Sequence, residues 1–268
     1  SPTWCWMATW INLSKATCAI ANMNLLNKIL SDKAREVAAR KKVVSLRTVQ
    51  AAAALAKPPR SFVRALRSRP MGLIAEVKRR SPSVGVIRTP FDPATIARAY
   101  EAGGAQALSV LMDEKYFGGG AGDFAEVRAA VKVPLLYKEL VVDPWQVWHA
   151  RSLGASAVLL IVAALERRKL RSLMGLITEL EMEPLVEVHD AREFDVAVDL
   201  GVRCLGVNNR NLKTFVTSLD TTFELAARAP RGTLLISESG IRTADDVVRL
   251  QTAGARGVLV GEHLLRKR

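Results

Sequence analysis

One pattern repeats eight times between residue 71 and the last residues of the sequence: a short apolar strand, a loop and an amphipathic helix. The apolar segments that predict the strands are residues 73–78, 107–112, 134–139, 157–162, 184–189, 204–208, 234–238 and 257–261. Near-continuous apolar strands that alternate with helices are typical of a parallel sheet covered on both faces. Several of the helical segments end in glycine just before the next strand, as a helix C-terminus followed by a short loop does.

Eight such units in about 190 residues favour a closed (β/α)8 barrel over an open sheet wound in both directions. Three parts of the chain are predicted. Residues 1–22 hold three of the five tryptophans and one charged residue, and we expect them to be poorly ordered or extraneous to the folded protein. Residues 23–70 form a basic helical extension that packs on the barrel, and residues 71–268 form the barrel itself.

Only the segment EHLLRKR follows the eighth predicted strand. This length is enough for a short turn of helix, so we expect the eighth outer helix to be truncated. Apolar barrel surface at that position would then need cover from the N-terminal helices, from a partner chain or from sequence not present here.

The net charge of +13 is concentrated at one end of the sequence. Residues 1–70 have a net charge of +11, whereas residues 71–268 have +2. Neither a recognition motif nor alternating aromatic residues accompany the basic segment, which favours attraction for an anionic metabolite over nucleic-acid binding. No apolar run reaches the roughly 18 residues needed to cross a membrane. Three scattered cysteines indicate reduced thiols in a cytoplasmic protein, because they are too few for a disulfide framework or a zinc cluster.

Charged and polar side chains stand where the predicted strands end. Glu76 and Lys78 of the first strand face the same side, because residues i and i+2 of a strand do. Other strands end in Lys138, Glu187 and Asn208. Active sites of (β/α)8 barrels lie at this end of the strands. Two lysines and two glutamates that meet there would move each other's pKa values apart, as acid–base chemistry at neutral pH requires.

Each of these residues alone also has a structural explanation. A glutamate in a strand is often half of an ion pair, Lys138 can reach solvent, and His189 fits a surface or supporting position better than catalysis. The GGGAG segment at residues 118–122 lacks the context of a dinucleotide-binding loop. The loops at residues 237–240 and 259–261 follow the last two strands, where such barrels bind phosphate through backbone N–H groups. Together the residues favour a phosphorylated small-molecule substrate and acid–base chemistry.

The order of eight motifs resembles that of the indole-3-glycerol phosphate synthase family: IAEVKRRSPS, LSVLMDEKYFGG, PLLYKELVVDPWQV, ARSLGASAVLLIVAAL, PLVEVHD, GVNNRNLKTF, ISESGI and GVLVGEHLL. The similarity extends from about residue 25 to residue 265. It implies a carboxy-lyase of tryptophan biosynthesis that converts 1-(2-carboxyphenylamino)-1-deoxyribulose 5-phosphate to indole-3-glycerol phosphate, with loss of CO2 and water. It also implies no metal, no organic cofactor, and a monomer or weak homodimer.

The resemblance assigns roles by position. Lys138 corresponds to the general acid, Lys78 would contact the substrate carboxylate and help water to leave, and Glu76 and Glu187 would keep the lysines charged and take up protons. The implied residues for binding and orienting the substrate are Asn208, Arg210, Ser81, Glu238, Ser239, Gly240 and Gly261, with Leu140, Leu159 and Leu212 around the aromatic ring. Many relatives carry an aromatic residue where this sequence has Leu140, so we expect a looser ring pocket and weaker substrate affinity.

Two other functions are compatible with parts of the sequence. A barrel related to phosphoribosylanthranilate isomerase would be expected to use a Cys/Asp acid–base pair, which the predicted strand ends do not supply. A barrel without catalytic activity would bind RNA through the basic N-terminal segment. Formation of a fluorescent indole product separates both from the ring-closing enzyme.

Overall fold

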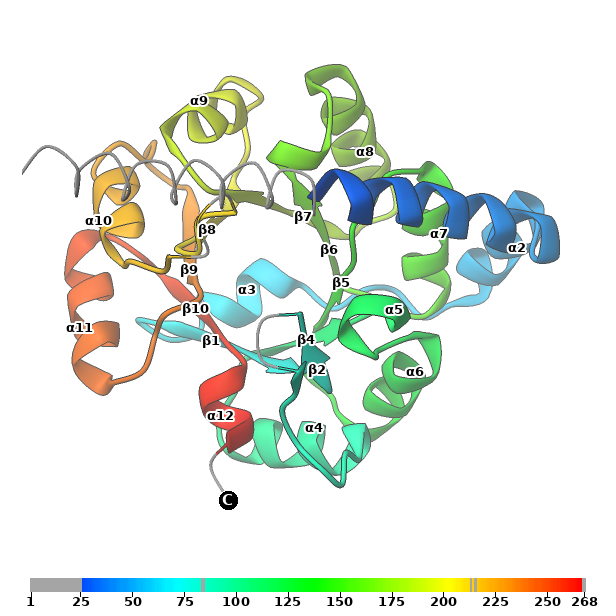
Figure 1. The fold of residues 1–268 in the computed structure, drawn as a ribbon, viewed down its shortest axis with the longest axis horizontal. Coiled ribbons are helices and arrows are strands. Elements are labelled where there is room, and N and C mark those ends of the chain that lie inside the picture. Colours follow the sequence, from blue (N-terminus) through cyan, green and yellow to red (C-terminus); the bar gives the residue numbers. More distant parts are fainter. Residues whose placement is uncertain (1–25, 83–84, 213, 215, 267–268) are drawn as a thin grey trace, which may run out of the picture.

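A closed barrel of eight parallel strands forms the centre of the computed structural model, which describes residues 26–82, 85–212, 214 and 216–266 (Figure 1). The strands are β1 (Gly72–Val77), β4 (Ala107–Leu111), β5 (Leu135–Lys138), β6 (Ala157–Ile161), β7 (Glu183–Val188), β8 (Cys204–Asn208), β9 (Leu234–Glu238) and β10 (Gly257–Val260). Each strand follows its predecessor around the barrel, and β10 closes it by pairing with β1. The predicted (β/α)8 barrel is confirmed, and each strand begins and ends within one residue of its predicted position. Residues 1–22, with the predictions made for them, lie outside the described residues.

Helices surround the barrel in alternation with the strands. They are α4 (Pro93–Ala102), α6 (Ala121–Ala130), α7 (Pro144–Ser152), α8 (Arg167–Glu179), α9 (Ala191–Asp199), α10 (Asp220–Ala226), α11 (Ala244–Ala253) and α12 (Glu262–Arg266), with the short α5 (Glu114–Phe117) and η1 (Val162–Ala164) in loops. A two-stranded hairpin of β2 (Arg80–Ser81) and β3 (Gly85–Val86) follows β1. Polar caps fix several helix starts: Asp92 and Asp143 accept backbone N–H groups of α4 and α7, and Thr243 does so for α11.

The strands bury side chains on both faces. One apolar cluster fills the inside of the barrel: Ile74, Ala107, Leu136, Ala157, Leu159, Leu185, Cys204, Leu234, Ile236 and Leu259. A larger cluster lies between the outer face of the sheet and the helices. The inner cluster also includes Phe62 and Leu66 of α3 (Phe62–Leu66), which precedes β1. A β carbon at Gly72, the first residue of β1, would lie 2.8 Å from the carbonyl oxygen of Leu66, so only glycine admits α3 this closely. The barrel is therefore filled from the end where its strands begin.

The N-terminal helices pack on one side of the barrel. A helix over residues 26–43 leads to α2 (Leu46–Leu55), and α2 packs against α7. Val37, Val49 and Trp145 share a small apolar cluster, and the Trp145 indole donates a hydrogen bond to the Val44 carbonyl at 2.9 Å. Figure 1 shows the helix of residues 26–43 in blue, crossing above β7 and α7.

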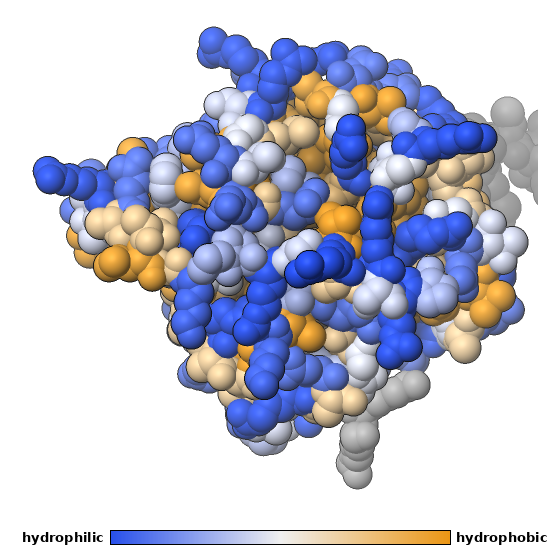
Figure 2. Space-filling view, turned by 180° about the vertical axis from the view of Figure 1, so that it is seen from behind, coloured by the Kyte–Doolittle hydropathy of each residue, from blue (hydrophilic) through white to orange (hydrophobic). Residues whose placement is uncertain are grey.

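The helix after the eighth strand, α12, is described over Glu262–Arg266; it packs against β1, and its Leu265 is buried. Among the described residues, α2 packs against α7, on a different side of the barrel from α12 (Figure 1). Figure 2 shows the opposite face of the molecule, where hydrophilic side chains surround smaller apolar patches. One apolar patch lies where the N-terminal helices project (Figure 2). Val43 and Leu55 of these helices are 86% and 89% exposed. Among the described residues, no helix combines the length and the apolar character needed to span a bilayer.

Candidate active site

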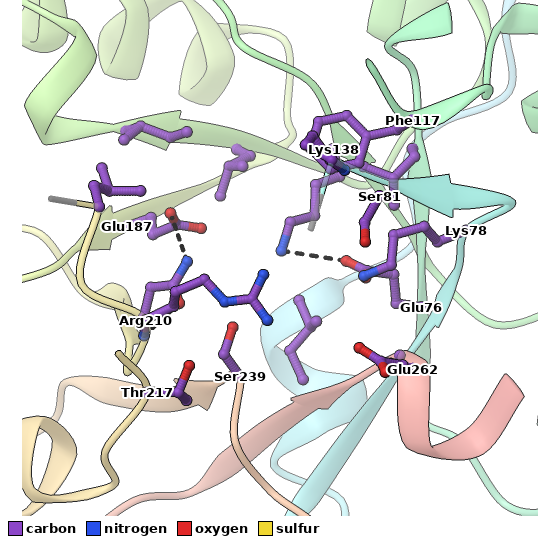
Figure 3. Close-up of a pocket in the computed structure, with 18 of the residues that line it drawn as sticks. Glu76, Lys78, Ser81, Phe117, Lys138, Glu187, Arg210, Thr217, Ser239 and Glu262 are labelled. Atoms are coloured by element: carbon purple, nitrogen blue, oxygen red, sulfur yellow. Dashed lines mark hydrogen bonds and ion pairs between the residues drawn. The ribbon is translucent and has the colours of Figure 1, made fainter. Parts of the chain in front are cut away.

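A cavity of about 500 Å³ opens where the barrel strands end (Figure 3). It receives side chains from the strand ends and from the loops that follow them, because parallel strands bring all their C-terminal ends to one rim. The predicted site residues that line it are Glu76, Lys78, Ser81, Lys138, Leu140, Leu159, Glu187, Asn208, Arg210, Leu212, Ser239, Gly240 and Gly261. Glu238, which was also predicted, is buried in an ion pair with Lys138 and is not among the lining residues.

Two ammonium groups and two carboxylates form a chain across one wall of the cavity. The Lys78 Nζ contacts Glu76 Oε1 at 2.5 Å, and the other oxygen of Glu76 lies 3.4 Å from Lys138 Nζ. Lys138 Nζ also lies 2.9 Å from Glu238 Oε2. At Gly261 a β carbon would approach Glu76 Oε1 to 2.6 Å, so the glycine leaves room for this carboxylate. The acid and base of the first strand are thus partners within the pocket, and Glu76 bridges the two lysines.

The charged side chains of the pocket shift one another's pKa values. Burial alone would raise the pKa of Glu76, but Lys78 and Lys138 lower it to about 2. Burial would lower the pKa of Lys138, and the carboxylates of Glu238, Glu76 and Glu187 raise it instead. Burial and the neighbouring carboxylates raise the pKa of Glu238 to about 7, although Lys138 opposes them. Lys138 is therefore charged at neutral pH. Of the carboxyl groups that contact Lys138, Glu238 has the pKa nearest to neutral pH, so it is the one that most readily binds a proton there.

Glu187 lies on the other side of the cavity and points into it (Figure 3). The Asn208 side-chain amide donates to its Oε1 at 3.2 Å, and the His189 Nε2 lies 3.0 Å from the same oxygen. Burial would raise the pKa of Glu187, but His189 and Lys138 lower it to about 2. Glu187 is thus an ionised carboxylate with a fixed orientation.

The loop after β9 is shaped for close approach of a ligand. Ser239 has φ 66° and Gly240 has φ 81°, so both adopt the left-handed conformation, which costs a non-glycine residue about 1–3 kcal/mol. Asn209 holds the loop by donating to the carbonyl oxygens of Glu238 and Ser239, each at 3.0 Å. Figure 3 shows the Arg210 guanidinium extending into the pocket near Ser239. A guanidinium and turn amides at one place suit a phosphate group.

Apolar side chains line a further part of the cavity. Leu140, Leu159 and Leu212 were predicted there, and Phe117 of α5 joins them. Leu26 and Ile29, on the helix of residues 26–43, also line the cavity, so the N-terminal extension forms part of its wall. These apolar walls fit an aromatic ring.

Sequence reasoning missed several lining residues. Leu26, Ile29 and Phe117 carry no signal beyond their apolar character, because no sequence pattern reveals which helix face meets the pocket. His189 did carry a signal: it follows Glu187 by two residues, as Lys78 follows Glu76. The prediction favoured a surface or supporting position for His189, and the structure buries it beside Glu187, where it supports a pocket carboxylate.

Comparisons with known proteins point to one family. The family model described as indole-3-glycerol phosphate synthase matches residues 26–268. A protein of that name from Acidithiobacillus ferrooxidans is 45% identical over 247 residues, which cover 91% of this chain and 94% of the relative. The relative from Magnetococcus marinus is 47% identical over 251 residues, with the same coverage of both chains.

Solved structures support the fold. An N-acetylmannosamine-6-phosphate 2-epimerase from Clostridium perfringens matches with a TM-score of 0.58 and 17% identity, over 73% of this chain and 88% of that one. A mandelate oxidase variant matches with a TM-score of 0.58 and 16% identity, over 74% of this chain and 66% of that one. At these identities the likeness extends to the barrel alone.

Proposed function

The chain belongs to the indole-3-glycerol phosphate synthase family, a group of carboxy-lyases in tryptophan biosynthesis, and from this premise we propose how its pocket closes the indole ring. One observation carries the proposal: Lys78, Lys138 and Glu187 line a single cavity that also contains the Ser239–Gly240 loop. The substrate, 1-(2-carboxyphenylamino)-1-deoxyribulose 5-phosphate, has an anionic phosphate, an anionic carboxylate and an aromatic ring, and the cavity has a complementary group for each.

In the bound substrate, the phosphate lies at Ser81, Ser239, Gly240 and Gly261, and the aromatic ring lies among Leu140, Leu159 and Leu212. Arg210 and Asn208 orient the chain between these ends. This arrangement holds the ring carbon that bears the carboxylate close to the ketone carbon, and such proximity supplies a large part of a rate enhancement.

The first stage forms the carbon–carbon bond. The ring carbon attacks the ketone carbon, and Lys138 donates a proton to the ketone oxygen. The carboxylate, held by Lys78, leaves as CO2, and the electron pair of the broken bond restores the aromatic ring. An alkoxide is far more basic than an amine, so Lys138 is a sufficient acid even with a raised pKa.

The second stage removes water. The new hydroxyl group leaves with a proton from Lys78, and the ring nitrogen stabilises the developing cation. Glu187 accepts the proton that is lost from the adjacent carbon as the pyrrole ring forms. Two protons enter and one is released, so each turnover takes up one proton from solvent. Glu76 and Glu238 act through the lysines, which they hold charged and in place.

We assign the two parts of the chain different tasks. Residues 71–268 carry out the chemistry, and residues 23–70 form a helical roof over the pocket. Leu26 and Ile29 support this assignment, because they line the cavity from the N-terminal helix. The reaction needs neither a metal nor an organic cofactor, and we expect a cytoplasmic enzyme that acts as a monomer or weak homodimer.

A steady-state fluorescence assay with the carboxyphenylamino substrate tests this function. We expect the wild-type protein to form indole product and Lys138→Met to lower kcat about 100-fold or more, the scale of a positioned acid. The matched control is Lys132→Met at an exposed lysine outside the pocket, which should leave kcat unchanged. Absence of product with the wild-type protein would refute the function, and near-normal turnover by Lys138→Met would remove Lys138 from its role.

A further inference from the structure

His189 lies between two carboxylates at the edge of the pocket. Its Nε2 is 3.0 Å from Glu187 Oε1, and its Nδ1 is 3.0 Å from Glu193 Oε2. The His189 side chain is 5% exposed, whereas that of Glu193 is 18% exposed. The three side chains thus form a row that leads from the pocket toward the protein surface.

The geometry determines the charge of this histidine. A neutral imidazole has one N–H donor, whereas the imidazolium has one on each nitrogen. The His189 Nδ1 hydrogen-bonds Glu193 Oε2 at 3.0 Å, and its Nε2 lies 3.0 Å from Glu187 Oε1, an ion-pair distance without an aligned hydrogen bond. The imidazolium is therefore the form that both carboxylates attract. A carboxylate facing an unprotonated ring nitrogen at this distance would be repelled.

Glu193 is itself held in place. It lies in the first turn of α9, and Asp190 caps that helix by accepting the backbone N–H groups of Arg192 and Glu193. The Glu193 carboxylate accepts the His189 backbone N–H at 2.9 Å as well as the contact from the ring. Two contacts from one residue, to the His189 backbone and to its ring, fix the position and the plane of the imidazolium.

We propose that His189 is a positioning residue of this active site: its imidazolium, held from behind by Glu193, fixes Glu187 as an ionised carboxylate aimed at the substrate. The inference rests on the proposed function, because it assumes that Glu187 accepts a proton in the dehydration stage. His189 and Asn208 both contact Oε1 of Glu187, so neither of them occupies Oε2. The other oxygen is then the one that meets the substrate.

The charges around His189 explain why the arrangement persists at the pH of the cell. Glu187 on β7 and Glu193 on α9 face the ring, Lys138 on β5 faces Glu187, and η1 contributes no titratable group. Burial would lower the pKa of His189, but the two carboxylates raise it to about 10. Glu187 therefore keeps its counterion through the neutral range and loses it only under alkaline conditions.

The charge of His189 can be measured without substrate. The sequence has three histidines, and nitrogen-15 NMR distinguishes an imidazolium from a neutral imidazole. We expect one imidazolium signal that persists above pH 8 in the wild-type protein and is absent from His189→Gln. If every imidazolium signal has disappeared by pH 8, the inference is wrong.

Kinetics test the effect on Glu187. His189→Gln keeps a hydrogen-bond donor but removes the charge, and we expect kcat to fall about 10-fold, less than for a direct acid, with KM changed less than about 2-fold. The matched control is His149→Gln, at a half-buried histidine that stacks on Trp145 outside the pocket; it should leave kcat unchanged. Wild-type kcat in His189→Gln would overturn the proposal.

A second variant separates positioning from a merely structural role. Glu193→Gln removes one of the two carboxylates at His189, so the alkaline limb of the kcat profile should move to lower pH by about one unit or more. Asp190→Asn, which neutralises a charge at the same helix start and keeps the cap, should leave the limb in place. Equal profiles for both variants would contradict the inference. Absence of product with the wild-type protein would instead refute the proposed function, while the NMR result would still report the charge of His189.

Discussion

Two clusters of buried lysines and carboxylates differ in what surrounds the ammonium group. The pocket cluster consists of Glu76, Lys78, Lys138, Glu187 and Glu238. The anchor cluster consists of Lys33, Glu36, Asp113 and Glu139. The two meet at adjacent residues, Lys138 and Glu139, near the end of β5. The two clusters thus combine the same residue types in one region of the molecule, yet we assign catalysis only to the pocket cluster.

In the anchor cluster the ammonium is fully engaged. Lys33 Nζ lies 2.8 Å from Glu36, 2.8 Å from Asp113 and 3.0 Å from Glu139, and its side chain is 1% exposed. An ammonium has three donors, so three carboxylates use its capacity. Asp113 follows β4 and Glu139 follows β5, so Lys33 ties the helix of residues 26–43 to two strand ends.

In the pocket cluster, the lysine ammonium groups keep N–H donors that carboxylates do not use. The carboxylates in contact with Lys138 within the described chain are those of Glu76 and Glu238, and the side chains of Lys138 and Lys78 are 16% and 17% exposed. Both ammonium groups line the cavity and can meet a ligand. The difference supports our assignment of catalysis to the pocket lysines, because their partners keep them charged without using all of their donors.

The largest expected effect is a loss of stability on replacing Lys33, whose ammonium group is surrounded by three carboxylates. Lys33→Met leaves the buried carboxylates of Asp113 and Glu139 without the cation they share, whereas Glu36 keeps Arg40, and we expect the free energy of unfolding to fall by about 3–5 kcal/mol. Urea denaturation measures this loss. The kcat of the folded variant should stay within a few-fold of wild type, whereas KM should rise because Leu26 and Ile29 lie on the released helix.

A surface pair provides the control. Lys41, on the same helix, pairs with Asp143 at 2.9 Å, but its side chain is 42% exposed. Lys41→Met should therefore change the free energy of unfolding by less than about 1 kcal/mol. If Lys33→Met were as mild as Lys41→Met, or lowered kcat as much as Lys138→Met, the contrast between the two clusters would be wrong.

The next effect sharpens the comparison through pH. Burial raises the pKa of Glu139 to about 7, although Lys33 opposes the rise. The folded protein then binds a proton at Glu139 that the unfolded chain, with an ordinary pKa of 4.5, has lost. Stability from this group is therefore present below pH 4.5 and declines as pH rises to about 7, by roughly 3 kcal/mol in total.

Glu139→Gln should remove that decline. We expect the free energy of unfolding of wild type, minus that of the variant, to fall between pH 4.5 and pH 7 and to be level above pH 8. Denaturation at a series of pH values measures the difference. A difference that does not vary with pH would show that Glu139 is already ionised below pH 5, and the anchor cluster would then balance its charges as the pocket cluster does.

Most of the pocket was predictable because it follows from local periodicity. Strands with period two place Glu76 and Lys78 on one face, and a parallel barrel brings their ends together with Lys138 and Glu187. This geometry needs only the order of the strands. For the same reason, His189 could have been placed in the pocket from its spacing to Glu187.

The anchor cluster was not predictable in this way. Lys33 lies on a helix outside the barrel repeat, and its partners Asp113 and Glu139 are distant in sequence. Its contacts depend on how that helix docks, which no periodicity of the sequence specifies. The family resemblance implies Glu238 as a substrate-binding residue; the structure buries it in an ion pair with Lys138 at 2.9 Å, and its role with substrate stays a prediction. Sequence therefore predicted the rim better than the groups that support it.

The smallest expected effect concerns the apolar wall that both clusters border. Leu140 follows Glu139 and lines the cavity together with Leu159, and a looser ring pocket is predicted at this leucine. Leu140→Phe should enlarge the contact with the substrate ring and lower KM about 5-fold, which corresponds to roughly 1 kcal/mol of aromatic contact. Its kcat should stay near wild type, because Leu140 contacts the ring and carries no proton.

The control for this variant is Leu212→Phe, at another apolar position of the same cavity and farther along the chain from both clusters. If the unfilled space beside the substrate ring lies at Leu140 in particular, Leu212→Phe should not lower KM. An equal decrease of KM in both variants would indicate that the whole apolar wall is loosely packed. A rise in KM with Leu140→Phe would mean that the wall is already filled, since overpacking moves neighbouring side chains. Because the anchor cluster sets the position of Leu26 and Ile29 across the cavity, combining Leu140→Phe with Lys33→Met should abolish the gain in affinity. Additive changes in KM would show that the roof and the wall act independently.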